Sequence, residues 1–153
     1  MALKKILVGI DFSPYTLPTL NFAKELATSL NAELILVNVI NRRTVDSAQQ
    51  ALLIAGNDLF ANFVEDKLAD HRVRMEELVK QAGCESNLNK ILIKIGVPYE
   101  EILTVIKEED ADLLVLGIKG RSNIADVIVG STAHKLYRRC QIPLLSLRCK
   151  PNN

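Results

Sequence analysis

The hydrophobic positions of this chain gather in five short runs that are apolar almost throughout. These runs occupy Lys4–Asp11, Glu33–Ile40, Lys90–Ile95, Asp112–Leu116 and Pro143–Leu147. Short runs in which successive residues are apolar are typical of strands that are covered on both faces of a parallel sheet. The pattern therefore predicts five parallel β-strands.

Between these runs, apolar residues recur every three or four positions, which is the period of an amphipathic helix. A first helix is marked by Leu17, Leu20, Ala23, Ala27 and Leu30. A long helix is predicted from Asp58 to Ala82 and ends at Gly83, a third begins at Pro98, and the last is marked by Ala133, Leu136, Tyr137 and Cys140. Strands that alternate with helices predict an α/β fold, an open five-stranded parallel sheet with helices on both faces.

The segment from Asn41 to Asn57 is ambiguous. We interpret Asn41–Thr44 as a loop, and residues 45–57 as a short helix that ends at Gly56 or as irregular structure. Because this segment lacks a firm period and follows the second strand, we expect it to be the least ordered part of the chain. We also expect its mobility to fall when a ligand binds at that end of the sheet.

Composition narrows the class of protein. The chain has 153 residues, of which 48% are hydrophobic, and a formal net charge of +1, which predicts one globular domain spanning 1–153 and excludes general disorder. It offers no long apolar span and no recognisable secretory leader, so we expect a cytoplasmic protein with no membrane or nucleic-acid partner. Its three cysteines form no CxxC pair, which argues against a disulfide framework or a zinc site.

Positive charge is concentrated in the last quarter of the chain. Residues 117–153 contain seven Lys or Arg residues and one acid, Asp126, whereas the preceding residues contain twelve basic and seventeen acidic ones. A solvated basic helix and an anion-binding end of the molecule explain this asymmetry equally well.

A glycine pattern favours the anion-binding interpretation. Gly117 and Gly120 follow the fourth predicted strand, and Gly130-Ser131 opens the last helix. Glycines permit close backbone approach, and the free N–H groups at a helix start attract phosphate. The alternative is that the three glycines merely shape a surface loop. The chain contains neither a GxxxxGK[ST] loop nor a GxGxxG fingerprint after its first strand.

The spacing G-2x-G-9x-G-[S/T] resembles the ATP-binding signature of the universal stress protein family. Further segments resemble that family in order along the chain: KKILVGIDFS, LILVNVI, GVPYEEI, ADLLVLGIKG and VGSTAHKLYRRCQIPLLSLR. The resemblance implies a Rossmann-like parallel sheet of strand order 3-2-1-4-5. It also implies a homodimer formed by antiparallel pairing of the edge strand at 143–147.

The resemblance further implies a set of ligand contacts. Asp11 would contact the nucleoside, the main chain of Val39 would pair with adenine, and the phosphates would bind at Gly117, Gly120, Gly130 and Ser131. Thr132 adds a donor near the helix start, and Lys119 and Arg121 carry charges that could neutralise phosphate. The alternatives are a role for Asp11 as a helix cap or a solvated turn residue, a core role for Val39 and solvent-facing roles for Lys119 and Arg121.

Together with the resemblance, these features predict an ATP-binding regulatory or stress-response module. Any Mg²⁺ or Mn²⁺ would be held mainly by the phosphates. One alternative is a slow ATP hydrolase, although the sequence shows no assured base and no Ser/His/Asp nucleophile. Another is a structural dimer that binds no nucleotide. His71 and His134 lack motif partners, so we assign them structural or surface roles and predict no catalytic residue.

Overall fold

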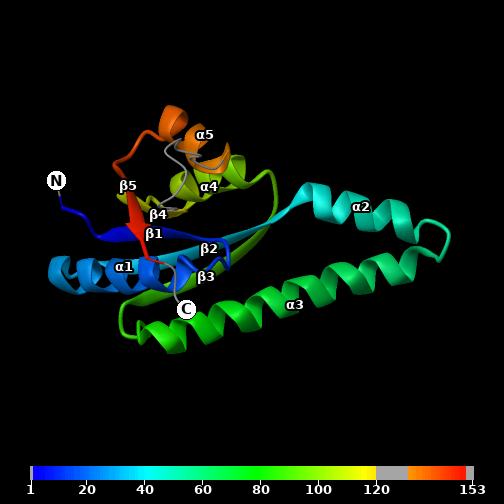
Figure 1. Ribbon diagram of the computed structural model, residues 1–153, viewed down its shortest axis with the longest axis horizontal. Helices are drawn as coiled ribbons and strands as arrows, with labels where there is room; N and C mark the ends of the chain where they lie inside the picture. The colour runs from blue at the N-terminus through cyan, green and yellow to red at the C-terminus, as the bar shows by residue number, and fades with distance from the viewer. Residues whose placement is uncertain (1, 120–130, 151–153) are drawn as a thin grey trace.

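Five parallel strands form one open sheet in the computed structural model of the chain, which describes residues 2–119 and 131–150 (Figure 1). The strands are β1 (Lys5–Ile10), β2 (Glu33–Asn41), β3 (Leu88–Gly96), β4 (Leu113–Lys119) and β5 (Leu144–Cys149). Their order across the sheet is β3-β2-β1-β4-β5, and every pairing is parallel. The predicted α/β fold and strand order are therefore confirmed.

Four helices cover the two faces of the sheet. On one face lie α1 (Thr16–Leu30) and α3 (Asn57–Ala82), and on the other lie α4 (Pro98–Glu108) and α5 (Ser131–Arg139) (Figure 1). The helix boundaries follow local chemistry, because Gly83 ends α3 in the left-handed conformation at φ 61° and Pro98 is the first residue of α4.

Each strand contributes to two hydrophobic layers, which explains why the strand sequences are apolar at successive positions. In β1, Ile6 and Val8 pack toward α1 and α3, whereas Leu7 packs toward α4 and α5. All three side chains are fully buried. Since side chains alternate across a strand, a strand with a helix layer on both faces requires apolar residues at odd and even positions alike.

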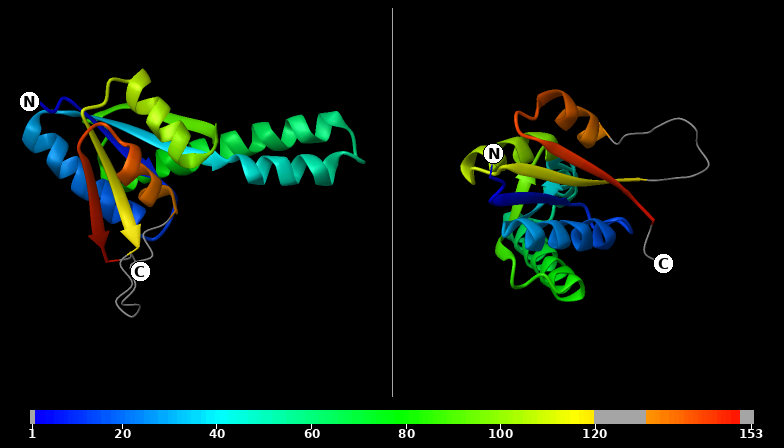
Figure 2. Two further views of the ribbon diagram at one scale, coloured as in Figure 1. Left: turned by 90° about the horizontal axis from the view of Figure 1, so that it is seen from above. Right: turned by 90° about the vertical axis from the view of Figure 1, so that its left-hand side faces the viewer.

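The predicted loop after the second strand is wrong. The helix α2 (Arg42–Leu52) begins directly after β2, and the Asn41 side chain caps it by accepting a hydrogen bond of 3.0 Å from the backbone N–H of Arg43. Asparagine is a favoured N-cap residue, so Asn41 was the signal for this helix. Figure 2 shows α2 and the adjoining part of α3 projecting from the sheet as a helical hairpin.

Strand β4 is longer than the sequence predicts. It continues past Leu116 to Lys119, and its last three residues pair with Leu147–Cys149 of β5. Gly117 is therefore a strand residue and not the start of a loop. The rest of the glycine pattern, Gly120 and Gly130, lies outside the described residues, as do Arg121 and Asp126.

None of the helices in the described part of the chain is both long enough and apolar enough to cross a membrane.

Candidate functional site

A cavity of about 610 Å³ lies at the carboxyl ends of β1, β2 and β4. The sheet order changes direction between β1 and β4, and ligands of open α/β sheets bind at such a switch point. Of the residues that the sequence predicts as ligand contacts, five line this cavity: Asp11, Val39, Gly117, Ser131 and Thr132. The structure thus brings together residues from four separate segments of the chain.

Asp11 follows β1 and lies at the cavity with an exposed side chain. Its Oδ1 accepts hydrogen bonds from the Ser13 backbone N–H at 3.0 Å and from the Thr16 hydroxyl at 2.9 Å. These bonds fix the turn that leads from β1 into α1. The carboxylate therefore orders the turn before α1 and does not cap this helix, whose N-cap residue is Tyr15, and no described hydrogen bond occupies its second oxygen, Oδ2.

Val39 lies where β2 extends beyond β1. The pairing of β1 with β2 ends at Ile10 and Asn38, whereas β2 continues alongside β3 as far as Asn41. The main chain of Val39 thus borders the cavity beyond the last residue of β1. Its side chain packs against the core under α4 and α5, so the core role and a main-chain contact with a ligand are compatible.

Gly117 has a packing reason to lack a side chain. A Cβ built at this position would collide with the Thr19 hydroxyl of α1, and Thr19 is almost fully buried. Thr19 is itself fixed by a hydrogen bond of 2.8 Å from its hydroxyl to the Tyr15 carbonyl. The glycine therefore allows α1 to approach β4 at the floor of the cavity, whatever the cavity binds.

The start of α5 contributes hydrogen-bond donors to the cavity. Ser131 is the first residue of this nine-residue helix, and Ser131, Thr132 and Ala133 line the cavity. The first N–H groups of a helix have no partner inside it, and they carry the positive end of the helix dipole. Lys119 is the last residue of β4, and its side chain lies outside the described part of the structure.

A polar cluster between β2 and α3 was not predicted from the sequence. Asn38 is buried in the middle of β2 between apolar neighbours, and its Nδ2 donates to the Ile10 carbonyl at 2.9 Å. Its Oδ1 lies 2.7 Å from Nδ1 of His71, which must donate because an amide oxygen only accepts. Asn38 thus connects α3 to the residue that precedes Asp11. The signal was present in the sequence as the one polar residue inside LILVNVI.

The surroundings of His71 favour its neutral form. Burial lowers its pKa below the ordinary value of 6.5, the cations of Arg74 and Lys67 lower it further, and Asp70 opposes them. With its proton on Nδ1, the neutral ring has an acceptor at Nε2, and His71 lines the cavity. The hydrogen bond with Asn38 agrees with the structural role that the sequence predicts for His71.

Helix α3 also brings positive charge to the cavity. Lys67 and Arg74 line it beside His71, and the Arg74 guanidinium lies 4.0 Å from the centre of the Phe12 ring. Among the described residues, Asp11 is the only carboxylate in the lining. The cavity can therefore attract an anion through residues outside the basic last quarter of the chain. No three His, Cys, Asp or Glu residues of the described chain are placed to hold a metal ion.

Comparison with known proteins identifies a family. The model of the universal stress protein family matches residues 2–148. Universal stress protein MJ0577 of Methanocaldococcus jannaschii is 27% identical over 155 residues, which span 96% of this chain and 96% of that protein. A solved structure of MJ0577 superimposes with a TM-score of 0.75 at 26% identity, covering 98% of this chain and 99% of that one.

Two more distant structures share the fold. A universal stress protein in complex with cAMP has a TM-score of 0.61 at 23% identity and covers 97% of this chain and 98% of its own. One from Archaeoglobus fulgidus in complex with dAMP has a TM-score of 0.57 at 17% identity and covers 97% of this chain and all of its own.

Proposed function

The chain belongs to the universal stress protein family, and we propose that it is an ATP-binding regulatory module whose ligand occupies the cavity at the carboxyl end of the sheet. One observation carries this proposal. The Asp11 carboxylate, the projecting main chain of β2 and the start of α5 line a single cavity at the switch point of the sheet. These groups match the three chemical parts of a nucleotide.

Each part of ATP has a matching group. The ribose hydroxyls donate to Oδ2 of Asp11, while Oδ1 stays bonded to Ser13 and Thr16. The adenine edge pairs with the main chain of Val39, where β2 runs past β1. The phosphates bind the N–H groups at the start of α5 and the hydroxyls of Ser131 and Thr132.

Residues 120–130, which lie outside the described part of the structure, complete the phosphate site in this proposal. Gly120 and Gly130 let the backbone approach the phosphates, and Lys119 neutralises part of their charge. Any Mg²⁺ or Mn²⁺ is held mainly by the phosphates. The structures with cAMP and dAMP support the proposal because the fold accommodates adenine nucleotides in those two proteins.

The proposed role is binding coupled to a change of conformation or partner. ATP transmits a signal only if it binds one conformation more tightly than another. The hairpin base is a candidate for that coupling, because Asn41 and Thr44 at the start of α2 line the cavity together with Lys67 of α3. Single-turnover release of phosphate would distinguish the alternative, slow hydrolysis, from simple retention of ATP.

Calorimetric titration with ATP, AMP and adenosine tests the proposal. The native chain should bind one ATP. Ser131→Ala should lower the affinity for ATP roughly tenfold or more, because a donor to a charged phosphate contributes about 1.5–3 kcal/mol. Adenosine should be affected less than ATP. Asp11→Ala should lower the affinities for ATP and for AMP by similar factors.

Ser29→Ala is the matched control. The Ser29 hydroxyl donates to the Glu25 carbonyl within α1 at 2.9 Å, and Ser29 is exposed and absent from the cavity lining. A native chain that binds no ATP, or a Ser131→Ala variant as tight as Ser29→Ala, would show that the assigned site is wrong.

A further inference from the structure

The cavity reaches both faces of the sheet, because it passes around the carboxyl ends of the strands. Ile10 and Phe12 pack in the layer with α1 and α3, whereas Leu116 and Ala133 pack in the layer with α4 and α5, and all four line the cavity. The phosphates of the proposed ATP bind at the start of α5, which belongs to the second layer. The part of the cavity beside α3 is therefore left without a ligand group.

Three side chains of α3 line this remaining part. Lys67, His71 and Arg74 are four and three residues apart, which places them on one face of the helix. Two contacts hold that face in place: Nδ1 of His71 lies 2.7 Å from Oδ1 of Asn38, and the Arg74 guanidinium lies 4.0 Å from the centre of the Phe12 ring. We call these three residues the α3 cluster.

Phe12 has an unusual backbone conformation at this place. Its φ is 57°, in the left-handed region that bulky residues rarely adopt. The conformation brings its ring against the α3 cluster, where it meets the His71 ring edge to face with the ring centres 5.2 Å apart. Strained residues of this kind persist where their surroundings hold them, and they gather at ligand sites.

The α3 cluster carries positive charge that is only weakly neutralised. Lys67 is in no ion pair among the described residues, and Nη1 of Arg74 lies 4.0 Å from Oδ2 of the exposed Asp70. An exposed pair at that distance contributes little. The charge acts inside the cavity, because Arg74 and Lys67 add to the effect of burial in lowering the pKa of His71. An anion is therefore favoured beside α3.

We propose that Lys67, His71 and Arg74 form a second phosphate subsite, separate from the one at the start of α5. This inference rests on the proposed function, because ATP bound at α5 is what leaves the α3 cluster without a ligand. The phosphate is either a group on the ribose of the bound nucleotide or inorganic phosphate. In the proposed pose the ribose hydroxyls face Asp11, and the next residue, Phe12, packs against α3, so a ribose phosphate extends toward the cluster.

A phosphate fits these side chains better than a carboxylate does. Lys67 supplies a point charge and Arg74 a planar set of donors, which bind separate phosphate oxygens. Nε2 of neutral His71 is an acceptor, because the ring proton is on Nδ1 facing Asn38. A phosphate group with a second pKa of about 6 keeps a hydroxyl for Nε2 in part of its population near neutral pH, whereas a carboxylate is fully ionised.

Calorimetric titration of the full chain with AMP and with adenosine 3′,5′-bisphosphate tests the proposal, because these nucleotides differ only in the phosphate on the ribose. If the ribose carries the second phosphate, the bisphosphate should bind at least tenfold more tightly than AMP. If the phosphate is free, the bisphosphate should gain nothing, and inorganic phosphate should bind to the chain saturated with ATP. Either result supports the subsite, and a chain that shows neither overturns it.

Two variants assign the effect to the α3 cluster. Lys67→Met and Arg74→Met should each bring the affinities for the bisphosphate and for AMP close to one another, or weaken inorganic phosphate about tenfold. Lys80→Met is the matched control, since Lys80 is exposed on the same helix and absent from the cavity lining, and it should behave as the native chain does. An effect of the second phosphate that persists in both cluster variants would also overturn the proposal.

The outcomes separate this subsite from the proposed function. A chain that binds ATP but no second phosphate contradicts the subsite alone. A chain that binds inorganic phosphate through Lys67 but does not bind ATP contradicts the proposed function and supports the subsite. The comparison of ligands on the native chain depends on no variant, and far-UV circular dichroism checks that each variant is folded.

Discussion

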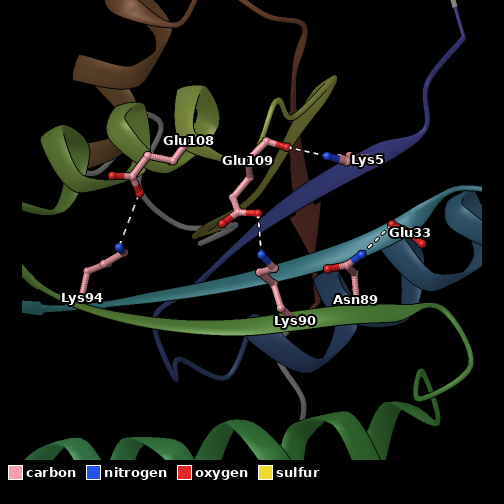
Figure 3. A network of polar contacts seen from close by, with 7 residues as sticks. All are labelled: Lys5, Glu33, Asn89, Lys90, Lys94, Glu108 and Glu109. Atoms are coloured by element: carbon pink, nitrogen blue, oxygen red, sulfur yellow. Dashed lines mark hydrogen bonds and ion pairs between the residues drawn. The ribbon is translucent and has the colours of Figure 1, made fainter.

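The two ends of the parallel sheet use their polar residues differently. At the amino end they bind one another: Asp112 Oδ2 accepts from the backbone N–H groups of Lys4 and Lys5, both at 2.9 Å. Figure 3 shows further contacts there, with Lys5 donating to the Glu109 carbonyl and Lys90 paired with the Glu109 carboxylate, each at 2.9 Å. These contacts tie the strand starts to each other and to the end of α4.

At the carboxyl end the polar groups surround a cavity. Asp11 uses one carboxylate oxygen for the turn after β1, and α5 begins there with donors that a helix cannot satisfy itself. His71, Lys67 and Arg74 approach from α3. The difference indicates that the amino end serves stability, whereas the carboxyl end retains hydrogen-bonding capacity for a ligand.

The largest expected effect follows from closing the carboxyl end. In Gly130→Val, a branched side chain directly before α5 should block the phosphates. The affinity for ATP should fall at least a hundredfold, which is about 2.7 kcal/mol of binding free energy. Folding should survive at a cost of about 1–3 kcal/mol if the glycine has a conformation that other residues rarely adopt. Calorimetry measures the affinity.

Gly83→Ala provides the comparison for that variant. Gly83 is in the left-handed conformation at the end of α3, away from the cavity, so its replacement should lower stability and leave the affinity for ATP unchanged. If folded Gly130→Val binds ATP as tightly as Gly83→Ala, phosphate does not bind at the start of α5.

A smaller effect is expected from breaking the amino end. Asp112→Ala removes the acceptor of two backbone N–H groups and should lower the free energy of unfolding by about 1–2 kcal/mol, with no change in ATP affinity. Urea titration measures the first quantity and calorimetry the second. The exposed Asp66→Ala on α3 should change neither, and a loss of ATP affinity in Asp112→Ala would contradict the division between the two ends.

Asp112 also predicts a pH dependence. Hydrogen bonds from the backbone N–H of Lys4 and then Lys5 lower its pKa below the ordinary value of 3.8, against the opposing effect of burial. A carboxyl with a lowered pKa in the folded state stabilises above its unfolded pKa, and this stability is lost as the pH falls through the folded value. The acid sensitivity below 3.8 should therefore be smaller in Asp112→Ala.

The smallest effect concerns His71 at the carboxyl end. Because its pKa is lowered in the folded state, the unfolded chain binds a proton more readily, so stability should fall as the pH drops below 6.5. His71→Gln keeps a donor for Asn38 but does not titrate. Urea midpoints at about pH 7.5 and about pH 5 should differ less in the variant than in the native chain. Equal differences would show that His71 does not contribute.

The sequence predicted the strands well because each contributes side chains to both hydrophobic layers and is therefore apolar at most positions. The sequence did not predict that a helix starts at Arg42. Because α2 buries no side chain, its sequence has no apolar stripe that matches the core. It also ended β4 too early, since glycine suggests a turn when the neighbouring α1 is not in view. Gly117 is instead a strand residue that makes room for Thr19.

Only those residues of the candidate site that lie in recognisable motifs could be predicted from the sequence. Asp11, Val39 and Ser131 lie near the ends of elements and match family segments, and the structure places all three at one cavity. The cluster of Asn38 and His71 was not predictable, because its partners are 33 residues apart and meet only when α3 packs against β2. A single polar residue in a buried strand was its only trace.

A chemical-shift titration of the labelled chain with ATP tests the central claim most directly. We predict that the largest changes occur at the backbone amides of Asp11, Val39 and Ser131, which line the cavity. The amides of Lys5 and Asp112 at the amino end should not change, because their polar groups already bind one another. Saturating ATP that leaves the cavity amides unmoved, or that shifts the amino-end amides instead, would contradict the proposed site.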